Sequence, residues 1–121
     1  MLTLGIATAG GIGAILRYLI DALLAAHRPW GIFCINAIGS FFLGTLLSFA
    51  LVPDPAWIAV LGVGFCGGFT TFSTASMDAV RIYLTRTELS KVQRVFGAAT
   101  YSLAMFLVCV ACACIGNLLV S

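Results

Sequence analysis

A cluster of side-chain hydroxyls lies in the middle of a long apolar stretch, directly after the adjacent glycines Gly67 and Gly68. The hydroxyls belong to Thr70, Thr71, Ser73, Thr74 and Ser76. Each glycine weakens a helix by roughly 1 kcal/mol relative to alanine, and hydroxyls suit a lipid-facing surface poorly, so we expect a broken helix here. Backbone groups exposed at such a break are tolerated where they face protein, water or an ion, which makes it a candidate ion site. A kink satisfied by hydroxyls that bond back to the helix is the alternative.

Three further side chains have the chemistry to contact an anion. The amide of Asn36 donates two hydrogen bonds, although Asn in an apolar span more commonly joins helices. Phe72 can turn the positive edge of its ring toward an anion, or it can simply pack. Arg17 either attracts anions at a vestibule or pairs with Asp21 four residues on. The hydroxyls, the amide and the ring edges predict an uncharged, donor-rich lining that suits a small, strongly hydrated anion better than a cation.

Four transmembrane helices must position these residues. The 121-residue chain is 62% hydrophobic and only 8% charged, whereas a soluble domain is about 25% charged. Its apolar runs are long enough for the roughly 20 residues that a helix needs to cross a bilayer core. We predict helices over about 2–25, 30–52, 56–84 and 92–119 within a single domain, 1–121. The predicted fold class is an all-α membrane protein with four transmembrane helices, the third broken at the bilayer midplane.

The distribution of positive charge predicts the orientation of these helices. All six Lys and Arg residues lie toward the side that holds the first and third loops. The other side holds both termini and the second loop, which contains Asp54. The positive-inside rule then places both termini outside the cell and the basic loops in the cytoplasm.

Small residues recur at every fourth position in the first two helices. They are Gly5, Ala9 and Gly13 in the first helix, and Ser40, Gly44 and Ser48 in the second. This pattern lets helix backbones approach closely. Because four tightly packed helices leave little room for a polar pathway, we expect any pathway to lie between subunits. Close packing without a transport role is the alternative explanation for the small residues.

Several function classes are not expected. The net charge of +2 is small, and no basic stripe with interleaved aromatic residues indicates nucleic-acid binding. The single histidine, His27, lies in a basic loop, and no nucleophile with a partner base can be recognised, so we predict that the chain is not an enzyme. A proton-coupled multidrug exporter would need a carboxylate well inside the first helix, and Asp21 lies too near its end.

Three segments resemble, in order and spacing, the signatures of the small fluoride-channel family (Fluc/CrcB). They are GGIGAILRY at 10–18, NAIGSFFLG at 36–44 and GFCGGFTTFST at 64–74. The resemblance implies an antiparallel dimer of oppositely oriented subunits, two fluoride pores, and a structural sodium ion (Na+) at the dimer interface. It also implies a multi-pass protein of a bacterial cell membrane, surrounded by membrane lipid. Fluoride would leave the cell passively, which lowers cytoplasmic fluoride.

The resemblance also implies roles for individual residues. The backbone carbonyls of Gly67 and Thr70 would hold the sodium ion. The residues that would line or support the pore are Asn36, Phe72, Ser73, Thr74, Tyr101 and Arg17. Tyr101 matches a tyrosine of the family's fourth helix, and Arg17 matches an arginine near the end of its first helix.

Three features depart from the family's usual pattern. Ala75 stands where a second pore phenylalanine is usual, and Met105 and Cys109 stand in place of a polar track that often follows the tyrosine. The charge bias of six to none is also stronger than subunits that insert both ways would carry. We therefore hypothesise a heterodimer with a homologous subunit of opposite orientation, with a homodimer as the other pairing. A non-conducting partner subunit of a heterodimeric fluoride channel is the alternative function.

Overall fold

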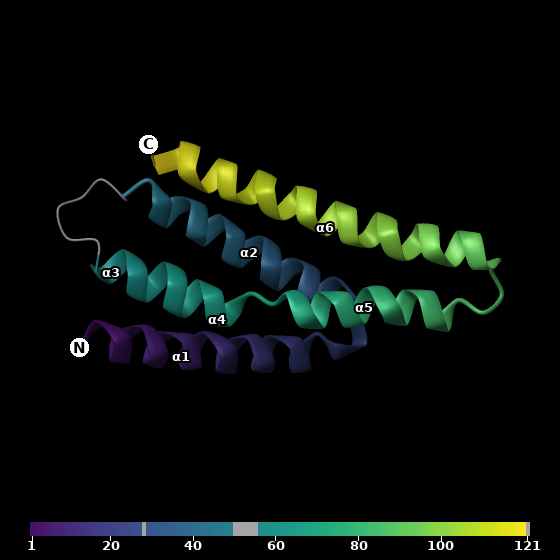
Figure 1. The fold of residues 1–121 in the computed structure, drawn as a ribbon, viewed down its shortest axis with the longest axis horizontal. Coiled ribbons are helices and arrows are strands. Elements are labelled where there is room, and N and C mark those ends of the chain that lie inside the picture. The colour runs from purple at the N-terminus through teal and green to yellow at the C-terminus, as the bar shows by residue number, and fades with distance from the viewer. Residues whose placement is uncertain (28, 50–55, 121) are drawn as a thin grey trace.

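The structure, a computed structural model, describes residues 1–27, 29–49 and 56–120. Four helical spans in this part of the chain are long and apolar enough to cross a membrane: Leu2–Leu23, Trp30–Leu47, Ala56–Thr85 and Lys91–Val120. The prediction of an all-helical, multi-pass membrane protein is therefore confirmed. Both ends of the chain lie at the same end of the molecule (Figure 1).

The first span is α1 (Leu2–Leu23), and it is followed by the short 3-10 turn η1 (Ala25–His27). We predicted that this helix would continue to residue 25. It ends two residues earlier, because the backbone at Leu24 leaves the helical region, with φ −94° and ψ 10°, and then tightens into the 3-10 turn. Helix ends commonly tighten in this way, since their last carbonyl groups have no partner in the α-helical ladder.

The second span, α2 (Trp30–Leu47), begins directly after Pro29, as predicted. Its predicted end at residue 52 is wrong, because a turn follows Leu47. Ser48 Oγ donates to the carbonyl and to the side-chain oxygen of Asn117, at 2.8 and 2.9 Å, which ties this turn to the last helix. Residues 50–52 of the predicted helix lie outside the described residues.

The third span consists of four consecutive segments: α3 (Ala56–Ile58), η2 (Ala59–Cys66), α4 (Gly67–Phe69) and α5 (Phe72–Thr85). The turns of η2 are wider than those of an α-helix, as in a π-helix. Between α4 and α5, Thr70 (φ −81°, ψ 158°) and Thr71 (φ −152°, ψ 128°) have extended backbone. The two hydroxyl residues that directly follow the α4 segment are therefore the non-helical ones. The end at Thr85 lies one residue from its predicted position, within the usual uncertainty of helix ends.

The last span, α6 (Lys91–Val120), agrees within one residue with the predicted range at both ends. A reciprocal cap fixes its start: the Ser90 N–H donates to Gln93 Oε1 at 3.0 Å, and the Gln93 N–H donates to Ser90 Oγ at 3.3 Å. Both donors would otherwise be unpaired at a helix N-terminus.

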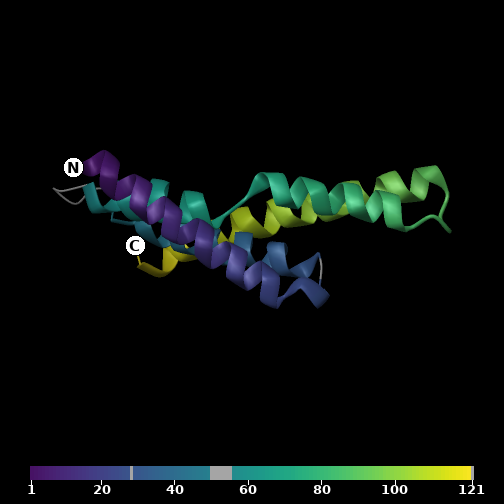
Figure 2. The same cartoon turned by 90° about the horizontal axis from the view of Figure 1, so that it is seen from below.

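Glycines allow the helices to pack closely. α2 packs along α6, α1 packs on η2 and α4, and α5 packs on α6. A Cβ atom on Gly44 would overlap the backbone of Ala113, and one on Gly68 would overlap the backbone of Gly10. In both views α5 and the first half of α6 project beyond the ends of α1 and α2 as a hairpin (Figures 1 and 2). The site described below lies at the base of this hairpin, where α4, α5, α2 and α6 meet.

Candidate ion site

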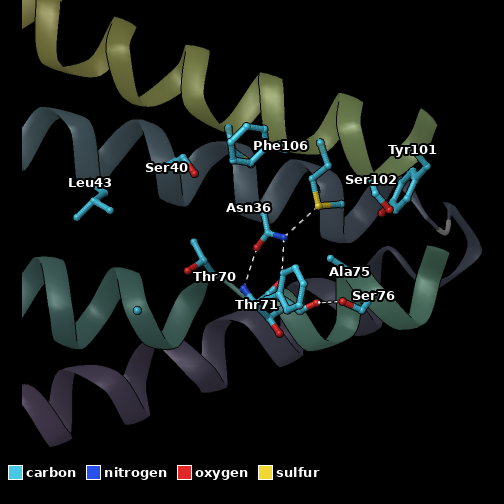
Figure 3. Close-up of a pocket in the computed structure, with 14 residues that line it drawn as sticks. Asn36, Ser40, Leu43, Thr70, Thr71, Ala75, Ser76, Tyr101, Ser102 and Phe106 are labelled. Atoms are coloured by element: carbon cyan, nitrogen blue, oxygen red, sulfur yellow. Dashed lines mark hydrogen bonds between the residues drawn. The ribbon is translucent and has the colours of Figure 1, made fainter. Parts of the chain in front are cut away.

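A cavity of about 520 Å³ opens between α2, the Thr70–Thr71 segment and α6 (Figure 3). It is lined by Asn36, Ser40, Leu43, Gly67, Thr70, Thr71, Phe72, Ala75, Ser76, Tyr101, Ser102, Met105, Phe106 and Cys109. None of these lining residues is charged. The lining therefore offers hydroxyls, one amide and aromatic rings, together with the apolar side chains of Leu43, Ala75 and Met105.

Asn36 connects α2 to the extended segment. Its Oδ1 accepts from the Thr71 N–H at 2.8 Å, and its Nδ2 donates to the Thr71 carbonyl at 3.0 Å. Nδ2 also donates to Met105 Sδ on α6 at 3.4 Å. Asn36 thus binds both the backbone N–H and the backbone carbonyl of Thr71, and it also contacts α6 (Figure 3).

The side chain of Thr71 caps the helix that follows. Its Oγ1 accepts from the Thr74 N–H at 3.4 Å and lies 3.1 Å from Ser73 Oγ. A hydroxyl at this position commonly satisfies a backbone donor in the first turn of a helix. Ser73 and Thr74 do not line the cavity in this chain, and their contacts support Thr71 instead.

The carbonyls of Gly67 and Thr70 have lost the donors that a continuous helix would supply. In a continuous helix the Gly67 carbonyl would accept from the Thr71 N–H, but that donor is held by Asn36. The Thr70 carbonyl would accept from the Thr74 N–H, but that donor bonds to Thr71 Oγ1. Both carbonyls are therefore released from their helical partners, and unwound carbonyls of this kind coordinate Na+ in membrane proteins.

Two phenylalanines and one tyrosine contribute rings to the lining. Phe72, the first residue of α5, is 87% exposed, so its ring contributes little to the core of this chain. Phe106 reaches the cavity from α6, above Asn36 in Figure 3. Tyr101 is buried, and its hydroxyl donates to the Pro29 carbonyl at 3.3 Å. Tyr101 therefore joins α6 to the start of α2 at the edge of the cavity.

The three residues that depart from the family's pattern all line the cavity. Ala75 is buried and contributes a methyl group, Met105 contributes the thioether that accepts from Asn36, and Cys109 is half-buried. These side chains make one part of the wall apolar.

Arg17 does not line the cavity. It lies half-buried on α1, and within the described residues its Nε is buried without a hydrogen-bond partner. Asp78, which the sequence reasoning passed over, is 1% exposed on α5. Neither residue is among those that surround the cavity.

Sequence reasoning also missed two lining residues of α6, Ser102 and Phe106. A usable signal was present, because residues spaced by three or four positions share a helix face. Ser102 lies three positions before Met105, and Phe106 lies three positions before Cys109, so extending the helix face of those two residues would have included both. The apolar character of the span concealed this stripe.

The chain is similar to proteins of a known family. A family model described as CrcB-like protein, Camphor Resistance (CrcB), matches residues 4–117. The chain is 46% identical over 89 residues to a protein of Leifsonia xyli subsp. xyli named fluoride-specific ion channel FluC 1, covering 68% of this chain and 64% of that protein. It is 41% identical over 85 residues to fluoride-specific ion channel FluC 1 of Thermobifida fusca, covering 66% and 68%. It is 42% identical over 81 residues to fluoride-specific ion channel FluC of Pyrococcus abyssi, covering 63% and 66%.

These relatives are named as ion channels and not as enzymes, in agreement with the prediction made from the sequence. The match spans slightly less than two thirds of the Leifsonia protein, at 64% of its length. The family match itself extends from α1 into the last turn of α6, over residues 4–117, and includes all residues around the cavity. The chain therefore belongs to the CrcB-like family, and the resemblance recognised in its three segments is confirmed.

Proposed function

We propose that this chain is a subunit of a fluoride-selective channel that lets fluoride leave the cell passively and so lowers cytoplasmic fluoride. The cavity carries this proposal. Its lining combines hydroxyls and aromatic rings without a fixed charge, at an interruption in a membrane span. Hydroxyls and the edges of aromatic rings would replace the water around a small anion, while the absence of a cationic side chain among these lining residues avoids binding the anion too tightly to release it.

A second subunit is part of the proposal. Phe72 is 87% exposed although it lines the cavity, so its ring projects from this chain and is available to a partner. The partner would be either a second copy or a homologous subunit of opposite orientation. The charge bias of six to none favours the homologous subunit, because one copy of this chain is expected to insert with its termini outside and its basic loops inside.

A structural sodium ion is also proposed, at the interface between the two subunits. The carbonyls of Gly67 and Thr70 would hold it, since neither bonds to its helical partner. The ion would supply positive charge that stabilises exposed carbonyls within the membrane, where unsatisfied backbone groups are costly.

A non-conducting partner subunit is the second candidate function. Ala75 and Met105 favour it, because they place a methyl group and a thioether in the wall of the cavity. In this case the chain would supply scaffold to a channel whose pore is lined mainly by its homologue.

Fluoride efflux from liposomes tests the two candidates. We expect vesicles that hold the purified chain to release fluoride when a potassium ionophore removes the opposing voltage, and to retain chloride under the same conditions. Equal loss of both anions would contradict a fluoride-selective channel. Silence of a folded preparation, relieved by adding a homologous subunit, would show that the chain needs this partner and would contradict a self-sufficient homodimer. The second candidate would then be supported if Phe72→Ile in this chain left the efflux of the mixed assembly unchanged.

Sodium is expected to stabilise the assembled protein against heat. A ligand present at one hundred times its dissociation constant adds about 2.7 kcal/mol of stability when it binds the folded state alone. We therefore expect a higher melting temperature in NaCl than in KCl or choline chloride at equal ionic strength. The same melting temperature in all three salts would contradict the proposed sodium site.

A further inference from the structure

Within the described residues the Asn36 side chain makes three hydrogen bonds, and all three are to other groups of this chain. Two join it to the peptide groups of Thr71, and the third joins it to Met105 Sδ (Figure 3). An Asn amide has two N–H donors, and here both have acceptors within the chain. We infer that Asn36 is a positioning residue, which keeps the third span interrupted between α4 and α5 and acts on the ion pathway through Thr71.

Whether the third span is interrupted between α4 and α5 depends on which acceptor the Thr71 N–H donates to. In a continuous helix this N–H would donate to the Gly67 carbonyl four residues earlier. Asn36 Oδ1 accepts it instead, at 2.8 Å. An unpaired peptide N–H within a membrane costs several kcal/mol, so Thr71 must bond to one acceptor or the other. Asn36 therefore competes with the helix for a single donor, and its presence favours the interrupted backbone.

α2 presents Asn36 from a rigid position. Asn36 is 7% exposed, and the preceding Ile32 and Ile35 are each 1% exposed. Three residues after Asn36, the missing side chain of Gly39 lets the methyl group of Thr70 lie against α2, because a Cβ at Gly39 would overlap Thr70 Cγ2. The extended segment thus contacts α2 at two neighbouring positions, through a hydrogen-bonded amide and through close packing.

The consequence of this role for ion transport rests on the proposed function, because Gly67 and Thr70 are the residues proposed to hold sodium. The positioning role of Asn36 itself does not depend on the proposed function. The backbone conformation of Thr70 and Thr71 can be measured without any ion flux, through the chemical shifts of threonine Cα and Cβ, which differ between extended and helical backbone.

Solid-state NMR of threonine-labelled protein in liposomes tests the inference. The wild type is expected to give extended-type shifts for Thr70 and Thr71. Asn36→Leu, which has a similar volume but no hydrogen-bonding group, is expected to lose these signals as the segment becomes helical or averages between conformations. Asn117→Leu is the matched control: Asn117 lies on α6 and accepts from Ser48 Oγ at 2.9 Å, so its replacement should leave both threonines extended.

Extended-type signals that persist in Asn36→Leu would overturn the inference. If that variant is not recovered as a folded protein, Asn36→Ser is measured in its place, because its side chain stays polar but is too short to bridge both groups of the Thr71 peptide. Fluoride efflux is recorded on the same wild-type samples. A wild type that is silent with and without a homologous subunit, yet extended at Thr70 and Thr71, with the signals lost in the Asn36 variant, would refute the proposed function and still support the positioning role.

Discussion

Replacing Gly68 by alanine is expected to destabilise the folded chain by about 1–3 kcal/mol, the range seen when an extra methyl group is forced into a packed interior. The added Cβ would overlap the carbonyl oxygen of Gly10 and lie 3.0 Å from its Cα. Because the obstacle is backbone, no side-chain rotation relieves it, and α1 has to move away from α4. Thermal unfolding in detergent measures the loss, as a lower melting temperature than that of the wild type.

Gly11→Ala provides the matched control on the facing helix. A Cβ at Gly11 has no neighbour within 4 Å among the described residues. The substitution should therefore stabilise α1 by about 0.5–1 kcal/mol, because alanine restricts the unfolded chain more than glycine does. A Gly68→Ala variant that melts at the wild-type temperature or above would show that α1 and α4 are not packed as closely as described.

Replacing Phe72 by isoleucine is expected to lower the fluoride efflux rate about ten- to thirtyfold, if the chain conducts as proposed. Hydrogen bonds to a charged group contribute about 1.5–3 kcal/mol, and we assign the lower part of this range to a ring edge facing an anion. Phe72 is 87% exposed, so the substitution removes the ring from the cavity with little effect on the core. The efflux rate per reconstituted protein is the quantity to measure.

Phe96→Ile is the control for this experiment. Phe96 is 73% exposed on α6 and does not line the cavity, so its replacement should leave the efflux rate unchanged. Melting temperatures of both variants should stay close to that of the wild type. A Phe72→Ile variant with the wild-type rate would exclude a direct role of this ring in conduction.

The number and position of the helices could be predicted from the sequence because each depends on local properties. The apolar length of a span, a proline before α2 and the Ser90 and Gln93 pair before α6 act over a few residues. The end of α2 was not predicted in this way, and the turn that follows it contacts Asn117, 69 residues along the chain, through Ser48.

The composition of the candidate site was also predictable, since polar residues in an apolar span are few and conspicuous. The sequence predicted that hydroxyls, glycines, Asn36 and Phe72 would lie within apolar helices long enough to cross a membrane. Which atoms these residues contact depends on how the helices pack. Asn36 bonds to partners 35 and 69 residues away, Ser73 and Thr74 support a helix cap, and Arg17 lies outside the cavity. The physical reason is that hydrophobicity sets the depth of a residue, whereas a hydrogen bond requires two groups within about 3 Å in the right direction, and only helix packing brings them there.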